Sequence, residues 1–233
     1  RLNMSHAEHE KVRVRIDDIR RIAKELRRHV AILMDIQGPK IRTGIFKDGE
    51  VELDTGQTFV FDQLEEEGDS KRVYTTYKTM YQDVSEGDQI LLDDGKMEVL
   101  VTAVEGTKVV TEVITGGVLK NKKGMNLPGV KIGLPPLTQK DMEDVAFGCE
   151  LDIDFMAISF VQRAADVELL RNILRKNKRD DVQIISKIEK PVAVQDIEKI
   201  IASSDAIMIA RGDLGVELSP EKVPMVQKRI CEL

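Results

Sequence analysis

The sequence predicts an α/β fold in which a parallel sheet is interrupted by a stretch of antiparallel β structure. Apolar runs without polar alternation are typical of parallel strands buried on both faces, and such runs alternate with helical patterns late in the chain. We expect strands over 153–160, 182–188 and 206–210, with helices over 166–176 and 192–202. Another run, 29–35, follows a helical pattern over 8–29.

Residues 44–133 have a different pattern. Short β-branched runs are separated there by Asp-Gly, Glu-Gly and Gly-Gly pairs, for example at Asp94-Gly95. Such pairs favour the tight turns of antiparallel hairpins. We therefore expect 1–43 and 134–233 to form the two parts of one parallel α/β domain, and 44–133 to form a β lid domain inserted between them.

Polar side chains end each of the predicted parallel strands. They are Asp35, Ser159, Lys187 with Glu189, and Arg211 with Asp213. The carboxyl ends of parallel strands meet at one edge of a sheet, and a (β/α)8 barrel places its active site there. The predicted fold class is therefore α/β, part of a (β/α)8 TIM-type barrel interrupted by an antiparallel β-barrel-like domain.

Composition excludes several classes of function. The 233 residues carry a net charge of −6, whereas nucleic-acid binding depends on clustered cations. Cys149 and Cys231 lack CxxC spacing, which indicates a reducing compartment and two unpaired thiols. No apolar run approaches the ~20 residues that cross a bilayer, so we expect a cytoplasmic protein without nucleic-acid or membrane partners. Because the first residue is Arg1 and the last ones continue a helical pattern, we also expect a piece of a longer protein.

The last two strand ends carry the strongest candidates for chemistry. Lys187 and Glu189 lie two residues apart and share a face if the strand extends that far. With Asp213 from the next strand end, two carboxylates would suit Mg²⁺, which also takes substrate oxygens and water. A salt bridge at the barrel rim explains the same spacing equally well. Gly212 and Gly215 would let the backbone approach an anion, although a simple loop is the commoner meaning of that pattern.

Three cations near turns or strand ends are candidates for phosphate binding. Arg1, Arg42 and Lys123 have the charge that phosphate recognition needs, and arginine can bind two oxygens at once. Each of them alone is more often a surface charge. The histidines lack the spacing of a metal site with a third ligand.

Five segments taken together resemble the pyruvate kinase family, in the order of that family's motifs. They are 1–6 (RLNMSH), 34–44 (MDIQGPKIRTG), 123–129 (KGMNLPG), 185–189 (ISKIE) and 207–217 (IMIARGDLGVE). The resemblance implies a (β/α)8 barrel, here from the end of strand 2 to strand 6, with a mobile β domain inserted after strand 3. It implies transfer of the phosphoryl group of phosphoenolpyruvate to ADP, giving pyruvate and ATP in the last step of glycolysis.

The resemblance also implies a role for each residue that matches a motif. Lys187 would be the catalytic residue and would stabilise the transferring phosphoryl group. The substrate-binding positions are Arg1, Lys187, Gly212 and Asp213, the nucleotide-binding positions are Asn3, Ser5, His6, Arg42 and Lys123, and the ligands of Mg²⁺ or Mn²⁺ are Glu189 and Asp213. The family is usually homotetrameric.

Lys40 departs from the commonest pattern of the family. Many members have glutamate at this position and require K⁺, whereas members with lysine resemble a K⁺-independent branch. The family's K⁺ ligands match Asn3, Ser5, Asp35 and the Ile36 carbonyl. We expect the Lys40 ammonium to replace the bound ion, so that K⁺ is not required.

Two alternatives stay open at this point. A metal-dependent barrel lyase or aldolase acting on pyruvate or phosphoenolpyruvate would use a similar metal and carboxylates. A noncatalytic fragment that only binds ligands would fit a chain that supplies about half of a barrel. The resemblance places the threonine that the family uses for proton transfer beyond residue 233, so we do not expect this stretch to be catalytic alone.

Overall fold

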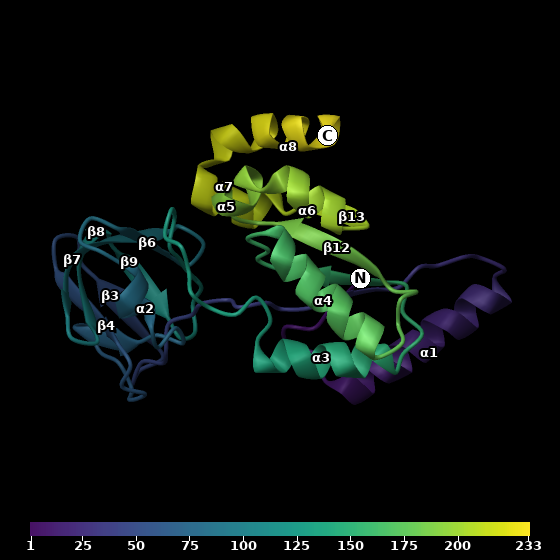
Figure 1. The fold of residues 1–233 in the computed structure, drawn as a ribbon. Coiled ribbons are helices and arrows are strands. Elements are labelled where there is room, and N and C mark those ends of the chain that lie inside the picture. The colour runs from purple at the N-terminus through teal and green to yellow at the C-terminus, as the bar shows by residue number, and fades with distance from the viewer. The chain divides into compact units, whose positions relative to one another are not determined.

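The chain divides into two units of mixed α and β structure (Figure 1). The computed structural model describes residues 1–233. The first unit comprises Arg1–Pro39, Pro135–Arg211 and Pro224–Leu233, and the second comprises Lys40–Leu134 and Gly212–Val223. None of the helices combines the length and the apolar composition that a membrane span requires.

A five-stranded parallel sheet forms the centre of the first unit. Its strands, in spatial order, are β1 (Leu2–Asn3), β2 (Leu33–Asp35), β11 (Phe155–Ile158), β12 (Gln183–Ile188) and β13 (Ala206–Ile209). The parallel strands that the unalternated apolar runs predict are therefore present, each shorter than predicted at one end or both. All of the strand ends that carry polar side chains lie on the same edge of this sheet, because parallel strands run in one direction.

Helices follow the strands of the first unit. They are α1 (His9–Glu25), α3 (Gln139–Cys149), α4 (Ala164–Lys176), α5 (Pro191–Gln195), α6 (Ile197–Ser203) and α8 (Val223–Glu232). In chain order, α7 (Arg211–Leu218) and the short 3₁₀ turn Pro220–Lys222 come between β13 and α8. Figure 1 shows α4 lying along β12, and α4 also contacts α6. Alternating strands and helices are the βαβ pattern that the sequence predicts.

Two predicted helices and one predicted loop need correction. The helix expected over 192–202 is two helices, because Asp196 leaves the helical conformation and its carboxylate accepts a hydrogen bond from Ala164 N at 3.1 Å. The helix expected over 8–29 ends at Glu25, and Arg27 has a positive φ of 51°. The Gly212–Gly215 stretch expected to be a simple loop is helical, in α7.

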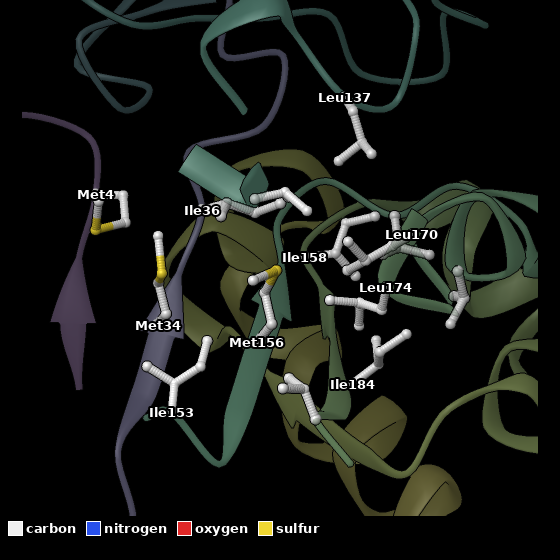
Figure 2. Close-up of a cluster of buried hydrophobic side chains, with 14 of the residues drawn as sticks. Met4, Met34, Ile36, Leu137, Ile153, Met156, Ile158, Leu170, Leu174 and Ile184 are labelled. Atoms are coloured by element: carbon white, nitrogen blue, oxygen red, sulfur yellow. The ribbon is translucent and has the colours of Figure 1, made fainter. Parts of the chain in front are cut away.

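One face of the parallel sheet packs against the helices through apolar side chains. Met34, Met156 and Ile184 are fully buried on neighbouring strands. Leu170 and Leu174 of α4 lie beside Ile158 and Ile184 in Figure 2. Side chains alternate between the two faces of a strand, so the residues between these apolar ones, Asp35 and Lys187 among them, face the other side.

The second unit is built mainly from antiparallel strands. Its six-stranded sheet has the order β10 (Met125–Asn126), β6 (Gln89–Leu92), β7 (Met97–Glu105), β8 (Lys108–Thr115), β4 (Thr58–Asp62) and β5 (Arg72–Tyr74), with only the β4–β5 pair parallel. A separate antiparallel pair joins β3 (Glu50–Leu53) to β9 (Gly117–Lys120), and α2 (Met80–Asp83) is a single turn. The tight turn between β7 and β8 contains Gly106 at a φ of 61°, as the Glu-Gly pair predicts.

Asp141 at the start of α3 connects two segments far apart in the sequence. Its carboxylate is fully buried and accepts hydrogen bonds from Thr138 N at 2.8 Å and from Thr138 Oγ at 2.6 Å, forming a capping box. It also accepts one from Gly38 N at 3.0 Å. The carboxylate therefore holds the segment that follows β2 against the start of α3.

We predict that Asp141→Ala destabilises the protein by roughly 2–4 kcal/mol, because buried donors lose a charged acceptor. Asp166 of α4 is the matched control, since it is equally buried but accepts only from residues within four positions, such as Gln162 N and Arg163 N. Asp166→Ala should cost about 1–2 kcal/mol. Urea unfolding measures both costs.

Hydrogen exchange at the Gly38 amide distinguishes the effect of the Asp141 variant from that of the Asp166 variant. Exchange should accelerate in Asp141→Ala and not in Asp166→Ala, because only Asp141 accepts from Gly38. An unchanged rate at Gly38 in the Asp141 variant would show that this hydrogen bond does not hold the segment.

Candidate functional site

The polar residues at the strand ends of the first unit lie together. In the sheet Asp35 pairs with Ala157, and Ala157 pairs with Ile185. Lys187 and Glu189 follow Ile185 at intervals of two and so keep its face, and Ser159 follows Ala157 in the same way. The alternation of the strands thus explains why these four side chains converge on one edge of the sheet.

Lys187 is at the centre of this group. Its ammonium donates to Ser159 Oγ at 2.7 Å and lies 2.9 Å from Glu189 Oε1 and 3.3 Å from Asp35 Oδ1. The lysine side chain is only 10% exposed, and the two carboxylates are more deeply buried still. A buried ammonium is stable only where acceptors surround it, and this arrangement supplies three.

Arg1 adds a second cation to the group. Its Nε and Nη2 atoms each lie 2.6 Å from Asp35 Oδ2, so Asp35 is placed between Arg1 and Lys187. The Arg1 side chain is 53% exposed. The charges of the two carboxylates balance those of the two cations. The exposed guanidinium of Arg1 is the group that an anion from solution reaches most easily.

The Ser159–Phe160 turn supplies two further contacts that the sequence analysis did not assign. Ser159 Oγ donates to the Ile36 carbonyl at 2.8 Å, and Phe160 N donates to Glu189 Oε2 at 2.6 Å. Phe160 has a positive φ of 55°, which is rare for an aromatic residue. The polar ending of the 153–160 run was the available signal for Ser159, whereas no sequence pattern predicts a backbone amide on Glu189.

The sequence predicted either a metal site or a salt bridge from the spacing of Lys187 and Glu189. The salt bridge is present, with Lys187 Nζ 2.9 Å from Glu189 Oε1. The oxygens beside it belong to carboxylates and to the Ile36 carbonyl, and Mg²⁺ prefers oxygen ligands of these kinds. No group of three or more His, Cys, Asp or Glu side chains forms a complete metal cage. Mg²⁺ usually takes one or two carboxylates together with water and substrate oxygens. The residues therefore fit a divalent cation whose coordination is completed by the substrate and water.

Asp213 and Gly212 lie in the first turn of α7, directly after β13. The first-turn amides of a helix have no partner within the helix and favour anions. A side chain built on Gly212 would meet no atom within 4 Å, so its backbone is open. Both residues belong to the second unit, and the pairing of Asp213 with Glu189 stays a prediction.

β1 and the loop after it contain the other predicted residues of the first unit. Asn3 pairs with Asp35 in the sheet, and its side-chain Oδ1 accepts a hydrogen bond from Ser5 N at 3.0 Å. The Met4 carbonyl accepts from Lys140 Nζ at 2.7 Å, which ties the loop to α3. His6 is exposed.

In the second unit, the predicted cations gather around one turn. Arg42 forms a β-bridge with Gly124, and its Nη1 donates to the Lys122 carbonyl at 3.1 Å. A side chain on Gly124 would lie 3.4 Å from Lys40 Cε. Lys123 Nζ lies 2.8 Å from Asp93 Oδ1. The structure thus brings Lys40 and Arg42 close to Lys123, which lies more than eighty positions later in the sequence.

Comparison with known proteins identifies the family. The family described as "Pyruvate kinase, barrel domain" matches residues 1–232. The chain belongs to the pyruvate kinase family. A pyruvate kinase of Clostridium perfringens is 46% identical over 233 residues, covering 100% of this chain and 49% of the relative. A pyruvate kinase of Staphylococcus aureus is 47% identical over 230 residues, covering 98% of this chain and 39% of the relative. The chain therefore spans about half the length, or less, of these curated relatives.

Asp93 gives a prediction for the cluster of Lys40, Arg42 and Lys123. Hydrogen bonds from Lys123, and then from Lys96, lower the pKa of Asp93 below its ordinary value. A lowered pKa in the folded state means that the pair contributes stability above the unfolded-state value of about 3.9 and loses it as pH falls through the folded value. NMR titration of the Asp93 carboxylate should find its midpoint below that of an ordinary aspartate.

Lys123→Met should raise the pKa of Asp93, because it removes the larger of the two hydrogen-bond contributions. Lys96→Met is the matched control, since Lys96 bonds the other Asp93 oxygen at 2.9 Å and contributes less. Equal shifts in both variants would contradict the assignment of Lys123 as the principal partner.

Proposed function

We propose that the protein to which this chain belongs transfers the phosphoryl group of phosphoenolpyruvate to ADP, giving pyruvate and ATP. The observation that carries the proposal is the buried Lys187 ammonium, held between Asp35 and Glu189 at the carboxyl edge of a parallel sheet with Arg1 beside it. The relatives named pyruvate kinase support it. They do not favour the lyase or the noncatalytic alternative.

The cations of the first unit suit this chemistry. Phosphoryl transfer passes through a loose transition state whose charge is spread over three oxygens, so the protein contributes position and fixed positive charge. Lys187 would stabilise that charge as the catalytic residue. Arg1, half exposed and paired with Asp35, would exchange its carboxylate for the phosphate of phosphoenolpyruvate. The open backbone at Gly212 would contact the same substrate.

Glu189 and Asp213 would hold a divalent cation, Mg²⁺ or Mn²⁺. Glu189 is 2% exposed and its carboxylate lies beside Lys187, so its oxygens are already in a water-poor setting. When bound, the cation would neutralise charge on the phosphoryl oxygens. The protein's own residues would orient the substrate and keep the Lys187 ammonium directed at it.

The second unit would supply the nucleotide side of the reaction. Arg42 and Lys123 gather at one turn there, and a cluster of cations is what the phosphates of ADP require. Asn3, Ser5 and His6 would complete the nucleotide-binding positions. We infer that 1–43 and 134–233 are parts of a (β/α)8 barrel and that 44–133 is an inserted β-barrel-like lid, in a cytoplasmic homotetramer.

We predict that Lys187→Met in the complete protein lowers kcat by about 10²-fold or more, as the loss of other electrostatic stabilisers does. Lys199→Met is the control, because Lys199 is an exposed lysine paired with Asp196 on α6. Formation of pyruvate from phosphoenolpyruvate and ADP is the assay. Near-normal turnover of the Lys187 variant would disprove the catalytic role.

We also propose that the monovalent-cation position needs no K⁺. Three of the four residues that match the family's K⁺ ligands already have donors to their oxygens within the chain: Ser5 N on Asn3, Arg1 and Lys187 on Asp35, and Ser159 on Ile36 O. Lys40 would add the positive charge that the ion supplies in other members.

Activity should therefore be similar in K⁺-free and K⁺-containing buffer. Lys40→Glu should make turnover depend on added K⁺, because it reverses the charge at that position. Lys47→Glu is a matched charge reversal elsewhere in the second unit, on an exposed residue. Steady-state rates at matched ionic strength measure both, and a strong K⁺ requirement of the unaltered protein would rule out the proposal.

A further inference from the structure

Ser159 is a buried polar residue to which the proposed chemistry gives no role. It is 3% exposed and follows β11, the strand that lies between β2 and β12 in the sheet. Ile158 pairs with Ser186, so the parallel register carried on by one residue sets Ser159 level with Lys187. A serine in this position lies between the strand end that bears Asp35 and the strand that bears Lys187.

The direction of its hydrogen bonds follows from the chemistry of its neighbours. An ammonium can only donate, so Ser159 Oγ must be the acceptor in its 2.7 Å contact with Lys187 Nζ. The hydroxyl proton then points to the Ile36 carbonyl at 2.8 Å, while Asp35 Oδ1 is farther away at 3.4 Å. Ile36 N donates to Ala157 O at 3.1 Å, so the carbonyl belongs to a fixed part of the sheet.

The other two partners of Lys187 differ from Ser159 in one respect. Asp35 is shared with Arg1, and Glu189 is the proposed ligand of a divalent cation, so both carboxylates have competing cations. The Ser159 hydroxyl is neutral, and its proton is committed to a backbone carbonyl. It is therefore the partner whose hold on Lys187 does not change when a cation or a phosphate enters the site.

The backbone around Ser159 is also closely packed. A side chain added to Gly38, which has a positive φ of 70°, would lie 2.9 Å from the Ser159 carbonyl oxygen and 3.1 Å from Ser159 Cβ. On the other side, the Phe160 amide donates to Glu189 at 2.6 Å. The hydroxyl is thus attached to a segment with little freedom to shift.

We propose that Ser159 is a positioning residue for Lys187, holding the ammonium at the carboxyl edge of the sheet so that it faces the transferred phosphoryl group. The proposal rests on the phosphoryl-transfer function given above. The serine touches no reacting atom and acts only through Lys187. Its effect should therefore fall on the rate of the chemical step and hardly on the binding of substrate.

The test compares two serines that neighbour Lys187. Ser159→Ala removes the acceptor, whereas Ser186→Ala makes the same change at a fully buried serine of β12 whose hydroxyl contacts Ser204 Oγ at 2.6 Å instead. A hydrogen bond to a charged group is worth about 10- to 100-fold in rate. We expect Ser159→Ala to lower kcat of the complete protein by that factor, with KM for phosphoenolpyruvate changed by less than about 3-fold.

Ser186→Ala should leave kcat within about 2-fold, because its side chain faces away from the site. Ser159→Cys preserves the shape but offers only a weak acceptor, and it should also lower kcat. It provides the same comparison if Ser159→Ala does not fold. Equal effects of the Ser159 and Ser186 variants on kcat, or a loss confined to KM, would overturn the proposal.

A second readout does not depend on turnover. In protein labelled with ¹⁵N at lysine Nζ, the Lys187 ammonium protons should exchange slowly with water, faster in Ser159→Ala or Ser159→Cys, and unchanged in Ser186→Ala. Unchanged exchange in the Ser159 variants would overturn the positioning role. If the unaltered protein transfers no phosphoryl group while the exchange difference remains, the proposed function fails and the hold of Ser159 on Lys187 stands.

Discussion

The structure of the first unit depends on how one buried ammonium is accommodated. Removing a charge from water costs several kcal/mol unless partners replace the lost hydration. Lys187 receives its partners from three strand ends: Asp35 from β2, Ser159 from β11 and Glu189 just after β12. These residues can meet only if the strands are parallel, adjacent and in the observed register. The ion pairs and the sheet topology therefore require each other.

The charges of the four charged side chains at this edge of the sheet also balance one another. Arg1 and Lys187 are matched by Asp35 and Glu189 within the unit, so these four side chains carry no net charge as a group. Under the proposed function, an incoming phosphate would exchange with a carboxylate that is already present. Much of the cost of desolvating and orienting the cations is met when the chain folds, and under the proposed function this would preorganise the site for a transition state.

The sequence predicted the part of this arrangement that depends on short-range pattern. Unalternated apolar runs located the parallel strands, and polar residues at their ends located Asp35, Lys187 and Glu189. The break at Asp196 escaped prediction because its cause is a hydrogen bond to Ala164, more than thirty positions earlier in the chain. The contact of Phe160 N with Glu189 escaped it for the same reason, since backbone donors leave no mark in the sequence.

The segment after β2 is constrained at Gly38 by its packing against residues around the site. The amide of Gly38 donates a hydrogen bond to Asp141, and the φ of 70° there suits glycine. A Cβ at this position would lie 2.9 Å from the Ser159 carbonyl oxygen. A larger residue there would push against the turn whose hydroxyl and amide hold Lys187 and Glu189. The next residue but one, Lys40, already belongs to the second unit. The chain therefore leaves the first unit directly from the packing around Lys187 and Glu189, and this packing limits which residues the exit segment can contain.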